Sequence, residues 1–258
     1  MGEYSTPSYG DAPYWDARYE KEGPEKTFDW YQQYTALAPI FDIYMDKASK
    51  VLMVGCGNAV LSEDMVQNGY QDIWNVDISS VVVDYMKKRN STIPQLKYDT
   101  MNVCSMGFDE SAFDVVLDKG TLDAILCGND SVENASAMLS EVCRCAESDI
   151  RAQSSFELHS MSDNIVAYFF CRVLKHGGKF LLITYGDPQV RMSHLQVDSL
   201  KWTVKVHALP RPGATAEVCP AWSLVPMKLC SNGRWVSNGD DLEGGNVHYI
   251  YVCTKDAC

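Results

Sequence analysis

Blocks of apolar residues alternate with amphipathic stretches along most of the chain. The apolar blocks at 51–54, 73–79, 113–120 and 177–186 are short and contain β-branched residues, which is typical of buried strands. The more polar run at 96–103 is also predicted to be a strand. Stretches with apolar residues at helical spacing lie between them, as in 82–86 and 133–144. This alternation predicts an α/β fold with a doubly wound, mostly parallel sheet.

Three residues mark where the predicted helices begin or break. An apolar helical face runs from Tyr31 to Met45, and we expect Pro39 to interrupt it because proline lacks the amide hydrogen that a helix needs. Ser79 or Ser80 is expected to cap the helix that follows the second strand, since a serine side chain accepts a hydrogen bond from the first helical turn.

The pattern changes after Asp187. Two β-rich runs, 202–209 and 248–255, have no helical spacing between them, so we expect a C-terminal antiparallel hairpin at the sheet edge. Together with the five earlier blocks, this hairpin makes a seven-stranded sheet. With 258 residues, of which 46% are hydrophobic, the chain can bury a sizeable core, and we expect a single domain over 1–258.

The first strand runs into the sequence Gly55-Cys56-Gly57 and then into a helical pattern. Glycine at a strand-to-helix turn lets the backbone approach a ligand, and the free N–H groups of the helix favour a polar or negatively charged group there. An ordinary tight turn is the alternative, because a G-x-G pattern alone has low specificity.

Polar residues follow at the ends of the next strands. Asp77 ends the second strand, about 20 residues after Gly55, where a carboxylate can accept hydrogen bonds from two ribose hydroxyls. Asn102 and Val103 end the third strand, and Asp118 and Lys119 end the fourth. Ligands of doubly wound sheets bind outside the carboxyl ends of the strands, so the pattern predicts a nucleotide-like cofactor. For Asp77 the alternative is a solvated strand-end residue.

Gly55, Gly57 and Asp77 fit either NAD or S-adenosylmethionine. Val60 stands where the third glycine of the dinucleotide fingerprint G-x-G-x-x-G would be, and we expect no second domain that could carry a hydride acceptor. The closing pair of strands is also the ending that class I methyltransferases show. These three features favour S-adenosylmethionine.

Five ordered motifs give the chain a more specific resemblance. They are PYWDARY (13–19), FDWY (28–31), VLMVGCGN (51–58), VDISSVVVDYM (76–86) and LDKGTLDAIL (117–126). With them the chain resembles the seven-strand, Rossmann-like methyltransferases related to the lysine methyltransferases of eukaryotic elongation factor 1 alpha. Five motifs in the same order are far more specific than any one of them.

The resemblance implies roles at the strand ends. Gly55 would line the methionine part of the cofactor, Asp77 would bind the ribose, and Ile78, Asn102 and Val103 would surround the adenine. Asn102 departs from the family, in which aspartate is usual at this position. Its amide oxygen can still accept a hydrogen bond from the adenine amino group.

The same resemblance makes the N-terminal segment, 1–30, a lid over the site. Trp15, Tyr19 and Trp30 would fold over the cofactor, and Lys119 would lie beside it. The residue types agree, because an aromatic face attracts a sulfonium or an ammonium group. The alternative is a hydrophobic latch that only packs on the sheet.

The resemblance favours a lysine side chain of an elongation-factor-like protein as the methyl acceptor. A lysine must lose its proton first, which costs on the order of 4 to 5 kcal/mol at neutral pH. Asp118 or Asp123 could orient the amine or pass its proton to water. For Asp123 the alternative is a charge that complements the helix dipole. A small-molecule methyltransferase and an inactive cofactor-binding form are the other functions left open.

Composition narrows the partners and the location. The formal net charge of −12 disfavours nucleic acid, because phosphate contacts need clustered Lys and Arg. The ten cysteines follow no disulfide spacing and form no zinc pattern with the five histidines, so we expect reduced thiols and no metal. No apolar run approaches the roughly 18 residues of a membrane span. We expect a cytoplasmic monomer that does not bind membranes.

The segment 145–172 is predicted to be an insertion. Cys-Arg occurs at 143–144 and again at 171–172, and removing the residues between them leaves a continuous amphipathic helix, a glycine turn and a strand. Arg-Cys can be encoded with a splice-donor GT, and Phe-Phe-Cys-Arg with a splice-acceptor AG. A retained in-frame intron is therefore one hypothesis, and a surface loop that binds a partner is the other.

Overall fold

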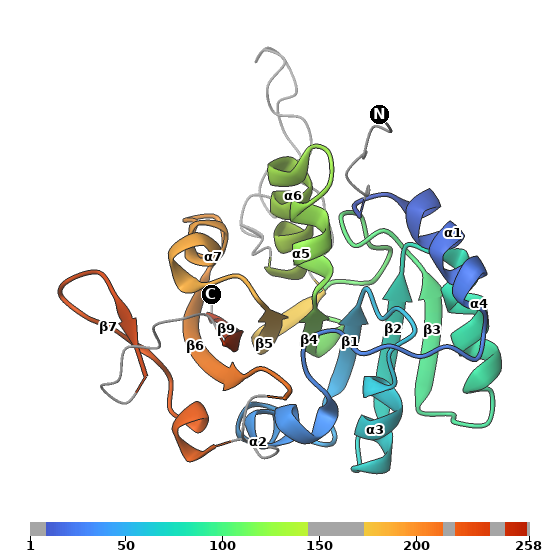
Figure 1. Ribbon diagram of the computed structural model, residues 1–258, viewed down its shortest axis with the longest axis horizontal. Helices are drawn as coiled ribbons and strands as arrows, with labels where there is room; N and C mark the ends of the chain where they lie inside the picture. Colours follow the sequence, from blue (N-terminus) through green and yellow to red (C-terminus); the bar gives the residue numbers. More distant parts are fainter. Residues whose placement is uncertain (1–8, 144–172, 214–219, 238–245, 257–258) are drawn as a thin grey trace, which may run out of the picture.

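A computed structural model describes residues 9–143, 173–213, 220–237 and 246–256. Seven strands form one sheet in the order β3-β2-β1-β4-β5-β9-β6 (Figure 1). They are β1 (Lys50–Val54), β2 (Asp72–Asp77), β3 (Leu96–Thr100), β4 (Phe113–Lys119), β5 (Leu174–Thr184), β6 (Trp202–Pro210) and β9 (Val247–Lys255). The strands from β3 to β5 pair in parallel, and β9 is antiparallel to both of its neighbours. The expected doubly wound, mostly parallel sheet is confirmed.

Helices cover both faces of the sheet and bury a core on each side (Figure 1). The helices are α1 (Ala12–Glu22), α2 (Tyr34–Tyr44), α3 (Leu61–Gln67), α4 (Ser80–Arg89), α5 (Thr121–Leu126), α6 (Ser131–Cys143) and α7 (Pro188–Leu195). Successive residues of a strand point to opposite faces. Val51 and Met53 of β1 therefore join the core with α1 to α4, whereas Leu52 and Val54 join the core with α5 to α7.

Helix α2 differs from its expected form in two ways. It begins at Tyr34 rather than Tyr31, because Tyr31 has a positive φ of 62°, which is incompatible with a right-handed helix. It also continues through Pro39, which was expected to interrupt it. Leu37, Ile40 and Phe41 are buried against the sheet, and this packing offsets the hydrogen bond that Pro39 cannot donate.

Two helices have no clear signal in the apolar pattern. Helix α1 buries only Tyr19 and carries charged residues around most of its surface. Helix α7 is short and is recognisable by its cap, since the Asp187 side chain accepts hydrogen bonds from the backbone of Gln189 and Val190. The expected cap of α4 is confirmed as Ser79, whose hydroxyl accepts from Val82 N.

The C-terminal strands pair as expected, but their connection is longer than a hairpin turn. Strand β9 lies between β5 and β6, so β6 forms the edge of the sheet. The described part of the connection contains a short 3-10 helix, η2 (Ala221–Leu224), and a separate two-stranded sheet of β7 (Lys228–Leu229) and β8 (Trp235–Val236). The third strand also ends earlier than expected, at Thr100, which leaves Asn102 and Val103 in the following loop.

The predicted insertion, 145–172, lies outside the described residues. Within the described residues, none of the helices is long and apolar enough to cross a membrane.

Candidate functional site

A pocket of about 320 Å³ lies at the carboxyl ends of the parallel strands. Its walls come from the turns after β1, β2, β3, β4 and β5 and from the N-terminal segment. This is the position at which ligands bind doubly wound sheets, and the volume falls within the range of small-molecule sites.

The turn after β1 requires glycine at two positions. Gly55 and Gly57 have φ values of 62° and 54°, a conformation that residues with a side chain rarely adopt. A Cβ atom at Gly55 would collide with the side chain of Thr121, and one at Gly57 would lie 2.9 Å from the hydroxyl of Tyr19. The two glycines therefore let α1 and α5 approach the turn closely and form the floor of the pocket.

Asp77 is a buried carboxylate at the end of β2, and it lines the pocket. Its Oδ2 accepts a hydrogen bond of 2.8 Å from Gly57 N, and its Oδ1 accepts one of 3.0 Å from Ser79 N. Burial raises the pKa of Asp77, while the two backbone donors oppose this shift. Each carboxylate oxygen can accept more than one hydrogen bond, so Asp77 retains acceptor capacity for a ligand.

The N-terminal segment contributes aromatic side chains to the pocket. Helix α1 carries Trp15 and Tyr19, whose rings stack with centroids 5.8 Å apart. The guanidinium carbon of Arg18 lies 5.3 Å from the ring centroid of Trp15 and 5.4 Å from that of Trp30. Arg18 thus links α1 to the loop before α2, because a cation between two aromatic faces is attracted by both.

The loop before α2 is attached to the sheet through Asp29. Its carboxylate lies 3.0 Å from Nζ of Lys119 at the end of β4, and it accepts a hydrogen bond of 3.2 Å from Val60 N. Lys119 also donates to the backbone oxygen of Trp30 at 3.0 Å. Burial lowers the pKa of Lys119, and the Asp29 carboxylate opposes this shift. The ion pair holds the segment across the pocket.

The two candidate catalytic aspartates occupy different positions. Asp118 is fully buried and does not line the pocket; its oxygens accept hydrogen bonds from Thr121 N at 2.7 Å and Leu122 N at 3.0 Å. Burial and the neighbouring Asp123 carboxylate raise the pKa of Asp118 to about 7. The Asp118 side chain therefore caps the start of α5 and does not face the pocket.

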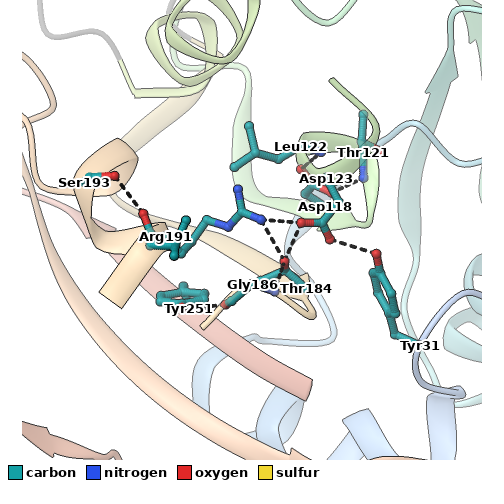
Figure 2. Close-up of polar contacts among 11 residues, drawn as sticks. Tyr31, Asp118, Thr121, Leu122, Asp123, Thr184, Gly186, Arg191, Ser193 and Tyr251 are labelled. Carbon is teal, nitrogen blue, oxygen red and sulfur yellow. Dashed lines mark hydrogen bonds and ion pairs between the residues drawn. The ribbon is translucent and has the colours of Figure 1, made fainter. Parts of the chain in front are cut away.

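Asp123 lines the pocket and accepts three side-chain donors (Figure 2). The hydroxyl of Tyr31 donates to Oδ2 at 2.9 Å, the hydroxyl of Thr184 donates to Oδ1 at 2.6 Å, and the guanidinium of Arg191 forms an ion pair with Oδ1. Asp123 also lies in the first turn of α5, so it can complement the helix dipole as well. The structure therefore agrees with a structural role and also places this carboxylate at the pocket wall.

The pocket brings together every candidate residue except Asp118. Those that line it are Trp15, Tyr19, Trp30, Gly55, Gly57, Asp77, Ile78, Asn102, Val103, Lys119 and Asp123. Asn102 also folds its own loop, because its Oδ1 accepts a hydrogen bond of 2.9 Å from Cys104 N. Thr121 and Tyr185 also line the pocket and were missed as site residues. Tyr185 follows β5 directly, so the same strand-end rule that selects Asp77 would have found it.

Comparison with known proteins places the chain in a family. Residues 52–149 match the methyltransferase domain family. The chain is 31% identical to EEF1A lysine methyltransferase 4 of Bos taurus over 197 residues, which are 76% of this chain and 69% of that protein. The chain therefore belongs to the family of methyltransferases that includes EEF1A lysine methyltransferase 4. It is also 34% identical to the eEF1A lysine and N-terminal methyltransferase of Bos taurus over 79% of its own length, but it spans only about a quarter (26%) of that protein.

The fold agrees with this family. The crystal structure of an S-adenosylmethionine-dependent methyltransferase from Methanosarcina mazei superposes with a TM-score of 0.53 at 13% sequence identity, covering 90% of this chain and all of that one. The expectation of S-adenosylmethionine rather than NAD is confirmed by the family. The pocket of the present chain also fits that cofactor, because it combines a turn that admits only glycine at Gly55 and Gly57 with the buried carboxylate of Asp77 at the end of β2.

Proposed function

We propose that the chain transfers methyl groups to the side chain of a protein lysine, and that elongation factor 1 alpha is the substrate. The observation that carries the proposal is the combination of a buried cofactor pocket with family membership, since the relatives that share this domain are named for lysine methylation of eEF1A.

The strand-end residues would hold the cofactor. Asp77 would accept hydrogen bonds from the ribose hydroxyls, and Ile78, Asn102 and Val103 would surround the adenine. Gly55 would lie against the methionine part, and a Cβ atom at this position would collide with the side chain of Thr121. When bound, S-adenosylmethionine supplies a methyl group on a positively charged sulfur.

The lid residues would exclude water and hold the cofactor cation. Trp15, Tyr19 and Trp30 line the pocket from the N-terminal segment, and their faces attract a cation. Lys119 would lie beside the cofactor and fasten this segment through Asp29. Most of the rate enhancement would then come from positioning in a dry site, and the acceptor ammonium would lose its proton to water more readily because burial lowers its pKa.

The test is to incubate the protein with S-adenosylmethionine labelled in the methyl group, with recombinant eEF1A and separately with whole-cell extract. We expect label on eEF1A, and mass spectrometry should locate it on a lysine side chain. Label that appears only in small molecules of the extract would support a small-molecule methyltransferase. Failure to bind S-adenosylmethionine would support a scaffold without catalytic activity.

A further inference from the structure

The pocket extends beyond the residues proposed to hold the cofactor. The glycine floor, Asp77 and the loop after β3 occupy the ends of β1, β2 and β3. The remaining wall lies over β4 and β5, and its polar side chains include Tyr31, Asp123 and Tyr185. Tyr185 is 50% exposed and Trp30 is 37% exposed, whereas Asp123 is only 4% exposed, so this part of the pocket runs from an aromatic mouth to a buried carboxylate.

Tyr31 lies between these two ends, and its ring is held on several sides. Its centroid is 4.9 Å from that of His248, 6.0 Å from that of Tyr185 and 6.2 Å from that of Trp30. A Cβ atom at Gly120 would lie 3.1 Å from the ring, so the turn after β4 also packs against it closely. The phenol therefore has little freedom to move.

The direction of the hydroxyl hydrogen follows from the partners of Asp123 (Figure 2). The Asp123 carboxylate is paired with the guanidinium of Arg191, and a carboxylate can only accept hydrogen bonds. The Tyr31 hydroxyl must therefore donate its hydrogen to Asp123 Oδ2, at 2.9 Å. Its oxygen keeps lone pairs that can accept a hydrogen bond from another donor in the pocket. Burial and the Asp123 carboxylate both raise the pKa of Tyr31, so the phenol stays protonated.

We propose that Tyr31 positions the acceptor amine, with Asp123 and Arg191 holding the phenol in place. The inference rests on the proposed function. A neutral lysine amine donates one N–H to the Tyr31 oxygen, which turns its nitrogen lone pair toward the methyl carbon. The N–C bond forms as the C–S bond breaks, the electron pair of the broken bond stays on sulfur, and the methylated ammonium releases a proton to water. Tyr31 gains and loses no proton.

The test compares Tyr31→Phe with Tyr44→Phe. Tyr44 lies on α2 outside the pocket, and its hydroxyl hydrogen-bonds Nε2 of His207 at 2.8 Å, so Tyr44→Phe is a matched loss of one partly buried tyrosine hydrogen bond. We expect Tyr31→Phe to lower kcat at least tenfold, with unchanged S-adenosylmethionine affinity in calorimetry. The rising limb of the pH profile should stay at the same pH, because Tyr31 is not the base. Tyr44→Phe should keep the wild-type kcat.

A double-mutant cycle tests the role of Asp123. Asp123→Asn keeps the shape but removes the charge, so the effects of Asp123→Asn and Tyr31→Phe should be strongly non-additive if Asp123 acts through Tyr31. Because Asp123→Asn leaves Arg191 without its counter-charge, the melting temperature is measured for each variant. Thr184→Val is tested in the same cycle should Asp123→Asn fail to fold; it removes one donor to Asp123, together with the acceptor of Gly186 N and Arg191. Equal kcat for Tyr31→Phe and wild type would overturn the inference.

The wild-type reactions separate this inference from the proposed function. Each variant is assayed with eEF1A and with n-butylamine, which carries the same primary amine on an alkyl chain. Turnover of n-butylamine alone would overturn the protein substrate while still allowing the Tyr31→Phe comparison. Turnover of neither acceptor by the wild-type protein would overturn both proposals.

Discussion

Asp77 combines a structural role with a proposed binding role in a single carboxylate. It accepts backbone hydrogen bonds from Gly57 and Ser79, and it lines the pocket at the end of β2. We predict that Asp77→Ala weakens S-adenosylmethionine binding by about 1 to 3 kcal/mol, since hydrogen bonds to a charged group are lost. Isothermal calorimetry measures the affinity, and NAD should bind to neither protein.

The control for this substitution is Asp72→Ala, at the other end of the same strand. Asp72 forms an exposed ion pair with Lys97 at 2.8 Å, far along β2 from the pocket, and exposed pairs contribute little to stability. The affinity of the Asp72→Ala variant for S-adenosylmethionine should equal that of the wild type. Measurable NAD binding, or an unchanged affinity in Asp77→Ala, would show that the ribose assignment is wrong.

His248 should make stability depend on pH. Its ring packs on Tyr31, and Nδ1 lies 3.2 Å from the side-chain amide of Gln32. Burial and the charge of Arg211 lower the pKa of His248 to about 4. Between that value and the ordinary value of about 6.5 the unfolded state binds more protons, so the free energy of unfolding should fall as the pH drops through this range.

The measurement is urea unfolding of wild type and His248→Gln between pH 4.5 and 7.5. The wild type should lose up to about 1.4 kcal/mol per pH unit from this group, and His248→Gln should remove that part of the slope. The exposed His176 provides a second variant, His176→Gln, which controls for the introduction of glutamine at a histidine position. Identical slopes in all three proteins would contradict the prediction.

At the scale of elements, the lid depends on the attachment of residues 28–31 to the sheet. Asp29 joins this loop to Lys119 on β4 and to the start of α3, and Lys119 is almost fully buried. We predict that Asp29→Asn lowers the free energy of unfolding by about 2 to 4 kcal/mol, because a buried cation loses its counter-charge. The KM for S-adenosylmethionine should rise, because the aromatic side chains of the lid would move away from the pocket with the loop.

Chemical denaturation and initial-rate kinetics measure the two effects. Asp42→Asn is the matched control, because Asp42 also pairs with a lysine, Lys47, at 2.9 Å, but in an exposed position. It should change stability by less than about 1 kcal/mol. A rise in KM in both variants, or in neither, would argue against a lid held by Asp29.

The sequence predicts those elements whose signal is local. Gly55 and Asp77 follow apolar runs directly, so the strand-end rule found them. The apolar pattern did not predict helix α1, because this helix buries a single residue, Tyr19, and has no apolar stripe. The hydrogen-bond network around Asp123 was not predicted, because Tyr31 and Arg191 lie 92 and 68 positions away in the chain and only the folded sheet brings them together. Asp118 was selected by the same rule as Asp77, but its side chain turns to cap α5.

At the scale of the whole molecule, the described residues on either side of the proposed insertion lie close together. Val173 N donates a hydrogen bond of 3.4 Å to Glu141 O, and Cys143 and Val173 are fully buried in the same core. If residues 145–172 were absent, Val173 would follow Arg144 and would be the fourth residue after Glu141. Its hydrogen bond is therefore the one that a continued α6 would make at this position.

We predict that deletion of 145–172 stabilises the protein and preserves methyl transfer. Shortening the connection should lower the entropic cost of closing it by on the order of 1 to 2 kcal/mol, since this cost grows with the logarithm of loop length. For a chain of this size that corresponds to a rise of about 2 to 8 °C in melting temperature. A variant with a glycine-serine linker of equal length in place of 145–172 separates loop length from specific contacts, and it should melt close to the full chain.

Transcript sequencing should reveal a shorter form if the segment 145–172 is a retained intron. A deletion variant that is less stable than the full chain, in the absence of any shorter transcript, would instead favour a loop that evolved for binding a partner.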